Sequence, residues 1–146
     1  MTPFIPQAWA TEPTVEAALD ERDAIRGALH AYFRGWFEAD PRRMRTVLHP
    51  RLAKFAVDAD TARSAGVVVL GYDEMVEATA NGNGVDRAGT GRVDISILGV
   101  SGPIASAEAR CDAYVEFVLL VREGPDWRIV SSAWRWADGA GPRASG

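Results

Sequence analysis

The sequence predicts an α+β domain in which N-terminal helices pack on a strongly curved antiparallel sheet and together form a cone-shaped barrel. Apolar residues recur every three or four positions in the first quarter of the chain, and β-prone runs fill the last third. Helices and short strands therefore come first and consecutive strands last, which is typical of α+β domains and not of doubly wound parallel sheets. A curved sheet with helices across its open side encloses a hollow suited to a ligand.

Size and composition limit the class of protein. The 146 residues suffice for one domain with its own core, and 47% hydrophobic and 25% charged residues are typical of a soluble globular chain. The net charge of −4 argues against a nucleic-acid partner. We find no signal peptide and no apolar run of membrane-spanning length, so we expect a cytoplasmic protein without a membrane partner. The single Cys111 lies in a strand-like run, which favours a buried packing role over a nucleophilic one.

Three segments are expected along the chain. Residues 1–13 hold three prolines and predict an extended arm. A single domain is expected over residues 14–138, and a flexible tail over residues 139–146.

Three helices are predicted. The apolar stripe from Val15 to Phe37 predicts a long first helix. Asp40 is a good N-cap and Pro41 a good first helical residue, so a second helix is expected over Arg42–Leu48. A third is expected over Tyr72–Ala80, where acidic residues in the first turn suit the helix dipole.

The strands are predicted from apolar and alternating runs. Two short strands are expected at Leu52–Val57 and Gly66–Leu70, and longer ones around Val93–Ile97, Tyr114–Val121 and Trp127–Trp136. The glycine-rich segment Asn81–Gly91 predicts a loop, and Gly124-Pro125-Asp126 predicts a hairpin turn.

Two motifs then resemble a known superfamily. They are Tyr32-x-x-x-Trp36-x-x-x-Asp40 followed by Leu48-His49-Pro50, and Phe117-x-Leu119-Leu120-x-Arg122-x-Gly124-x-x-Trp127-Arg128-Ile129-Val130. In their order and spacing they are similar to the nuclear transport factor two-like superfamily, within it to the lumazine-binding-like and SnoaL-like group, over roughly residues 20–136. The resemblance implies a cone-shaped α+β barrel and frequent dimers through the outer sheet face. It also implies mixed functions, among them isomerases, cyclases, dehydratases, epoxide hydrolases and binding modules, so the fold does not settle the function.

Tyr32 and Glu116 are the leading catalytic candidates. Tyr32 stands where ketosteroid-isomerase-like members carry a tyrosine that donates to a substrate oxyanion; the alternative is a core tyrosine. Glu116 interrupts an apolar strand where relatives place an acidic residue inside the cone, and burial among aromatic rings would raise the pKa of its carboxyl. The alternatives are a glutamate paired with Arg110 or Arg135, or one in solvent at the mouth.

His49 and Asp112 are weaker catalytic candidates. His49 could reach the pocket mouth as a proton-transfer group, or act as a helix cap. Arg110 and Asp112 resemble the Arg-x-Asp pair of epoxide hydrolases, but the last strand has no second carboxylate. The short span between the strands also predicts a tight turn over Arg110–Ala113, which would leave Asp112 in solvent.

Aromatic residues supply the expected ligand contacts. Trp134 and Trp136 share a strand face with Val130 and Ser132 and would stack on a flat ligand. The candidate ligand-binding residues are Trp36, Phe55, Tyr72, Met75, Tyr114, Ser132, Trp134 and Trp136. The alternative is that these side chains fill the cone. With two histidines and no close carboxylates, no metal site or cofactor is expected.

Two functions therefore remain open. One is a pocket that binds a small apolar or aromatic molecule, with acid–base isomerisation, cyclisation or dehydration by Tyr32 and Glu116. The other is a non-catalytic carrier or interaction module with a filled cone. Both alternatives include a homodimer through the outer sheet face.

Overall fold

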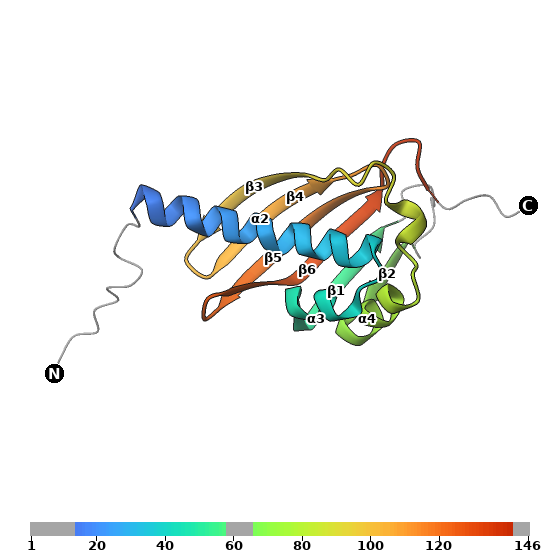
Figure 1. Ribbon diagram of the computed structural model, residues 1–146, viewed down its shortest axis with the longest axis horizontal. Coiled ribbons are helices and arrows are strands. Elements are labelled where there is room, and N and C mark those ends of the chain that lie inside the picture. The colour runs from blue at the N-terminus through green and yellow to red at the C-terminus, as the bar shows by residue number, and fades with distance from the viewer. Residues whose placement is uncertain (1–13, 58–65, 142–146) are drawn as a thin grey trace, which may run out of the picture.

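Helix α2 (Val15–Phe37) lies along the hollow side of a curved sheet (Figure 1). Thr14 caps it by accepting a hydrogen bond from the backbone N–H of Ala17, and its buried stripe includes Ile25 and Leu29. The computed structural model describes residues 14–57 and 66–141. The expected N-terminal arm and the last five residues of the expected tail lie outside the described residues.

The other helices close one side of the hollow. Helix α3 (Pro41–Val47) begins after Asp40, whose carboxylate accepts from the N–H of Arg43, and α4 (Tyr72–Ala80) has the predicted bounds. The expected loop after α4 contains one 3₁₀ turn, η1 (Val85–Arg87). Across the described ranges we find no helix long and apolar enough to cross a bilayer.

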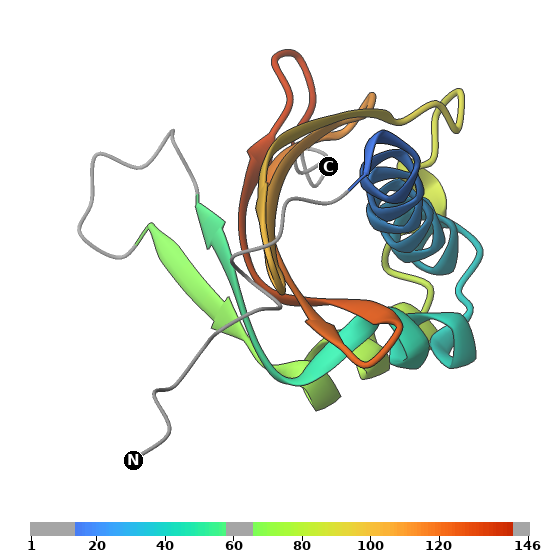
Figure 2. The ribbon, with the colours of Figure 1, turned by 90° about the vertical axis from the view of Figure 1, so that its left-hand side faces the viewer.

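Six strands form one unclosed sheet in the order β2-β1-β6-β5-β4-β3. Their bounds are β1 Leu48–Val57, β2 Val67–Leu70, β3 Asp94–Ser101, β4 Ile104–Arg110, β5 Tyr114–Glu123 and β6 Asp126–Trp136. Neighbouring strands are antiparallel, except that β1 runs parallel to β6. Figure 2 shows the sheet curling around α2 while β1 and β2 diverge from the curl. The predicted α+β class with a curved sheet is confirmed.

The connections on either side of β5 follow the predicted turns. Gly124 has a φ of 59° between β5 and β6, a conformation that favours glycine. The tight turn expected before β5 is confirmed, because β4 ends at Arg110 and β5 begins at Tyr114. Cys111 therefore lies in this turn, and its predicted place within a strand is wrong.

A β-bulge in β6 decides which side chains point inward. Leu119 of β5 pairs with Ser131, whereas Leu120 pairs with Ile129, so Val130 is an extra residue. Ile129 faces the core before the bulge, and Ser132 is buried after it. Val130 contributes to a hollow on the outer face instead, so it does not share the face of Trp134 as predicted.

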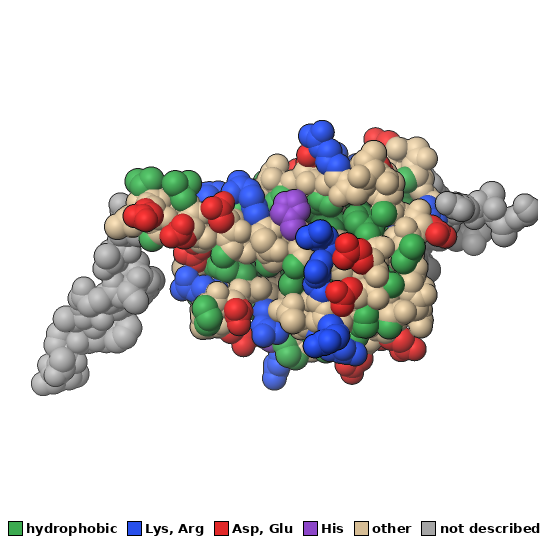
Figure 3. Space-filling model, viewed as in Figure 1, with side chains coloured by type: hydrophobic (Ala, Val, Ile, Leu, Met, Phe, Trp, Pro, Cys, Tyr) green, Lys and Arg blue, Asp and Glu red, His purple; other side chains and the backbone are tan. Residues whose placement is uncertain are grey.

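The two faces of β5 differ as its alternation predicts. Glu116, Val118 and Leu120 are at most 2% exposed on the inner face. Phe117 and Leu119 on the outer face are each 53% exposed. A second apolar surface lies at the start of α2, where Val15 and Leu19 project beyond the sheet (Figure 3).

Candidate functional site

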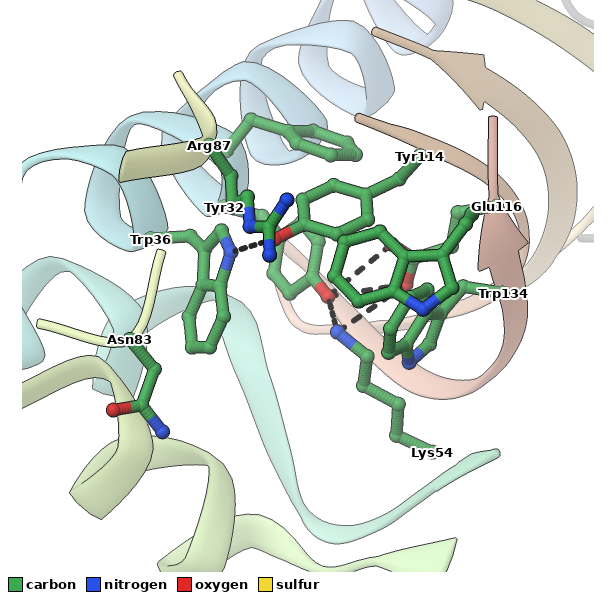
Figure 4. Close-up of a pocket in the computed structure, with 10 residues that line it drawn as sticks. Tyr32, Trp36, Lys54, Asn83, Arg87, Tyr114, Glu116 and Trp134 are labelled. Atoms are coloured by element: carbon green, nitrogen blue, oxygen red, sulfur yellow. Dashed lines mark hydrogen bonds and ion pairs between the residues drawn. The ribbon is translucent and has the colours of Figure 1, made fainter. Parts of the chain in front are cut away.

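Three polar side chains meet inside the hollow, one each from α2, β1 and β5 (Figure 4). The Tyr32 hydroxyl donates to the Glu116 carboxylate, with oxygen–oxygen distances of 3.0 and 3.3 Å. The Lys54 ammonium donates to the Tyr32 oxygen, and its Nζ lies 3.8 Å from Glu116 Oε2. We call these three residues the polar triad.

Burial shifts the pKa values of Tyr32 and Lys54. Tyr32 and Glu116 are each 2% exposed and Lys54 is 7% exposed. Burial raises the pKa of Tyr32 well above its ordinary value, and the neighbouring Glu116 raises it further. Burial lowers the pKa of Lys54, although the charge and hydrogen bonding of Glu116 act in the opposite direction. Tyr32 is therefore held as a neutral donor, and Lys54 gives up its proton more readily than an exposed lysine.

Aromatic rings surround the polar triad. Trp36 Nε1 donates to the Tyr114 hydroxyl at 3.1 Å. The rings of Tyr114, Trp134 and Trp136 pack against one another with centroids 5.1–5.3 Å apart. Lys54 Nζ lies 5.7 Å from the Trp36 ring and 5.8 Å from the Trp134 ring, distances at which a cation is attracted to a ring face. Burial also raises the pKa of Tyr114.

The triad and the rings line a cavity of about 230 Å³. Its walls are Tyr32, Phe33, Trp36, Lys54, Asn83, Arg87, Tyr114, Glu116, Trp134 and Trp136. An apolar cavity of about 150 Å³ can hold a benzene molecule. The space therefore suits a compound of one ring or two fused rings.

The loop after α4 forms the rim of this cavity. The Arg87 guanidinium lies 4.6 Å from the centre of the Trp136 ring and donates to the carbonyl of Gly141 at 2.8 Å. A Cβ on Gly84 would lie 2.3 Å from Trp36 Nε1, so only glycine lets this loop approach the indole. Gly141, within the expected tail, therefore lies beside the Arg87 guanidinium at this rim.

Two buried polar atoms beside the cavity lack a partner among the described residues. They are the Ser132 hydroxyl and the indole N–H of Trp134. Ser132 stands opposite Lys54 in the register of the parallel β1–β6 pair. Because a buried polar group without a hydrogen bond costs free energy, the N–H of Trp134, which lines the cavity, is available to a ligand.

Six of the predicted site residues line the cavity together: Tyr32, Trp36, Tyr114, Glu116, Trp134 and Trp136. Two others lie behind it. Met75 is 1% exposed, with its Sδ 3.9 Å from Lys54 Nζ, and Ser132 is 4% exposed. The alternative partners of Glu116 are excluded, since Arg110 pairs with Glu108 and Arg135 with Asp138.

Two predicted ligand contacts lie elsewhere. Phe55 lies in a hollow of the outer face with Phe117 and Leu119, so its predicted pocket position is wrong. Lys54, its neighbour in β1, takes the inward position because side chains alternate along a strand. The Tyr72 hydroxyl reaches the carbonyl of Arg45 at 3.5 Å, and Tyr72 joins α4 to α3 without lining the cavity.

His49 and Asp112 are also placed away from the triad. His49 Nε2 contacts Glu123 at the far end of β5, which at about 3.3 Å per residue is roughly 20 Å from Glu116. Asp112 is exposed and accepts from the backbone N–H of Thr90 at 2.8 Å, so it ties a loop to the turn before β5. Neither residue lies at the triad, so the expected position of His49 at the pocket mouth is wrong, whereas the solvent position expected for Asp112 is confirmed.

Lys54 is the functional residue that the sequence prediction missed. A signal was present, because Lys54 is the only lysine of the chain and every other basic residue is arginine. An arginine cannot lose its proton in a protein, whereas a buried lysine can. Among the described residues, no group of three His, Cys, Asp or Glu side chains is placed to hold a metal ion.

Comparison with solved structures places this architecture among known folds. An NTF2-like protein of unknown function from Shewanella baltica matches with a TM-score of 0.64 at 20% identity, over 86% of this chain and 98% of that chain. A similar protein from Silicibacter pomeroyi matches with a TM-score of 0.65 at 13% identity, over 82% and 98% of the two chains. A structure described as a putative scytalone dehydratase from Novosphingobium aromaticivorans gives 0.58 at 13% identity, over 85% and 89%. These likenesses show the fold.

Comparison of sequences identifies the family of this chain. No curated protein sequence matches the chain. The family model described as "Putative lumazine-binding" matches residues 20–135, which is most of the chain. The chain therefore belongs to this lumazine-binding-like family, and its fold is the one seen in the NTF2-like structures.

Proposed function

We propose that the protein binds a small apolar or aromatic molecule bearing a carbonyl group and converts it by acid–base catalysis without a cofactor. The observation that carries the proposal is the polar triad at the wall of an aromatic cavity of about 230 Å³. Isomerisation, cyclisation and dehydration all require a proton to leave one atom and another to reach an oxygen. A phenol and a carboxylate in contact supply both functions.

Each member of the triad has a role in this proposal. Tyr32 donates its hydroxyl hydrogen to the carbonyl oxygen of the ligand, where negative charge develops. Glu116 accepts a proton from the carbon next to that carbonyl and returns it at another atom. Lys54 stabilises the charge on both neighbours, and the Trp134 and Trp136 rings stack on the ligand.

The comparisons support a bound small molecule. The family description names lumazine binding, and one structural neighbour is described as a dehydratase. The alternative function is a carrier that binds in the same cavity without turnover. An open cavity favours either of these over a cone filled by its own side chains.

We also propose that two copies associate through the outer sheet face. Large apolar side chains there are more than half exposed, namely Leu98, Ile104, Phe117 and Leu119. Soluble monomers rarely leave a contiguous apolar patch of this kind uncovered. A cytoplasmic location stays a prediction.

The binding and catalytic parts of the proposal have separate tests. 2-Tetralone, an apolar two-ring ketone, should quench tryptophan fluorescence saturably in the native protein, and Trp136→Ala should abolish this quenching. In D₂O the protein should then speed deuterium uptake at the carbon next to the carbonyl, measured by NMR. Glu116→Gln should lower that rate by about 10²-fold or more while the ligand still binds.

Glu108→Gln is the matched control. Glu108 lies on β4, next to β5, and pairs there with Arg110 outside the cavity. This variant should exchange at the native rate. Saturable binding with no exchange above the buffer rate would leave the carrier alternative and remove the catalytic one. Absence of any saturable quenching would overturn both.

A further inference from the structure

We propose that Lys54 is a nucleophile that forms an imine with the carbonyl carbon of an aldehyde or ketone ligand. This inference rests on the proposed function and deepens it, because it names the reacting group of the ligand and a covalent step. In the proposed function Lys54 acts only through its charge on Tyr32 and Glu116. In this inference the Lys54 nitrogen itself reacts with the ligand.

The position of the Lys54 amine is the first argument. Lys54 lines the cavity and is 7% exposed, so its Nζ is reached through the cavity and hardly at all from the surface. The rings of Tyr32, Trp36 and Trp134 lie 4.9–5.8 Å from this nitrogen, so a flat ligand stacked in the cavity would lie within its reach. Confinement of two reacting groups in one small space raises their effective concentration.

The triad also provides a route by which the amine becomes neutral. The Lys54 ammonium donates to the Tyr32 oxygen, and the Tyr32 hydroxyl donates to Glu116. One proton can move from Lys54 to Tyr32 while another moves from Tyr32 to Glu116. The result is a neutral amine, a neutral phenol and a neutral carboxylic acid. Exclusion of water by a bound ligand favours this state, because it removes two buried charges.

The covalent step balances with groups that are present. The Lys54 nitrogen attacks the carbonyl carbon, a C–N bond forms, and the carbonyl oxygen takes a proton relayed from Glu116 through Tyr32. The nitrogen then returns one proton to the same relay, and the relay passes that proton to the hydroxyl, which leaves as water. The nitrogen lone pair forms the C=N bond of a protonated imine, and Glu116 is again a carboxylate. The indole N–H of Trp134, which lines the cavity and has no partner among the described residues, can donate to the oxygen of the tetrahedral intermediate.

A lysine that acts only through its charge would not require the neutral state. Burial favours that state, since it lowers the pKa of Lys54 despite the nearby carboxylate. An arginine would supply the charge as well, and the chain uses arginine at every other basic position.

Reductive trapping tests the inference without a known substrate. The native protein is incubated near pH 7 with benzaldehyde and sodium cyanoborohydride, which reduces an imine to a stable benzylamine. Peptide mapping by mass spectrometry then compares Lys54 with the amino terminus, since these are the only primary amines of the chain. An ordinary lysine is neutral roughly 10² to 10³ times less often than an α-amino group near pH 7. We expect Lys54 to be labelled at least as fast as the amino terminus.

Three controls test whether the labelling of Lys54 depends on the folded cavity and on the triad. Labelling in urea should reverse the preference, because the unfolded chain lacks the triad. Benzyl alcohol, which has the ring without the carbonyl, should slow labelling of Lys54 but not of the amino terminus. Tyr32→Phe should slow labelling at Lys54 at least about tenfold, since it breaks the proton route.

The outcomes separate this inference from the proposed function. Benzaldehyde that quenches tryptophan fluorescence saturably but labels only the amino terminus would overturn the imine and leave the binding site intact. A Lys54 adduct that appears equally in urea would also overturn it. Lys54→Arg, which keeps the positive charge but has no primary amine, should give no adduct at residue 54.

Discussion

The two faces of β5 reverse the usual rule for side chains in opposite ways. The inner face buries the charged Glu116, which is 2% exposed, while the outer face exposes Phe117 and Leu119, each 53% exposed. A buried carboxylate costs free energy unless it is paired, and exposed large apolar residues gain nothing from the fold of one chain. Neither face is therefore explained by the stability of the monomer alone.

The difference lies in where each face finds its partners. Glu116 finds its own within the chain, because α2 brings Tyr32 and β1 brings Lys54. The outer face meets no covering helix within the described parts of the chain (Figure 2). The inner face thus has its partners within the chain, whereas the partner that we propose for the outer face is a second copy of the protein.

Replacement of Lys54 on the inner face should have the largest effect on stability. Lys54→Met leaves Glu116 buried without a cation and should lower the free energy of unfolding by about 3–5 kcal/mol. Adding Glu116→Gln to the same chain should recover about half of the loss or more. Urea unfolding at pH 7 measures both.

Arg122→Met is the matched control, because it removes an ion pair at the surface. It breaks the 2.8 Å pair between Arg122 and Glu21 at the surface and should cost less than about 1 kcal/mol. If Lys54→Met were no more costly than Arg122→Met, the triad would not be a buried ion pair.

A charge placed on the outer face should weaken the association of two copies and leave the fold of each copy intact. Leu119→Lys should raise the dissociation constant of the homodimer at least about 30-fold, which corresponds to about 2 kcal/mol. The unfolding free energy of the monomer should change by less than about 0.5 kcal/mol. Sedimentation equilibrium measures the first quantity, and Glu77→Lys on α4 is the control. A native chain that stays monomeric at all concentrations would exclude the dimer.

The smallest expected effect is a dependence of folding stability on pH, caused by the phenol of Tyr32 inside the hollow. The pKa of Tyr32 is raised in the folded protein, so above pH 10 the unfolded chain loses the phenolic proton while the folded chain keeps it. The unfolded state then binds fewer protons, and stability falls as pH rises, by up to about 1.4 kcal/mol per pH unit. Tyr32→Phe should lower this slope by about the contribution of one phenol in urea titrations at several alkaline pH values, leaving the part due to Tyr114, whose pKa is also raised. Tyr72→Phe should retain the native slope.

The helices and the choice of pocket aromatics could be predicted from sequence because their signals are local. The three-and-four spacing of α2 sets its buried stripe, and the strand alternation of β5 places Glu116 inward. Phe55 and Lys54 could not be assigned in the same way. Both faces of the sheet are apolar, so hydrophobicity favours Phe55 for the inside although Lys54 occupies that position.

The errors at Val130 and Tyr72 have a different origin. The bulge that turns Val130 outward is set by the register with β5, which no local pattern in β6 encodes. Tyr72 depends on how α4 docks beside α3, a contact between residues distant in sequence. Assignments of this kind need the tertiary structure.

The extra residue in β6 has a consequence for how this chain could change over time. If the bulge were lost while every residue of β6 was kept, strict alternation from Ile129 would point Ser131, Ala133 and Arg135 into the hollow and turn both terminal tryptophans outward. Deletion of Val130 would instead remove the bulge and leave Ser132, Trp134 and Trp136 facing inward. The aromatic lining of the chamber therefore tolerates loss of this one codon, whereas it depends on the bulge as long as Val130 is present.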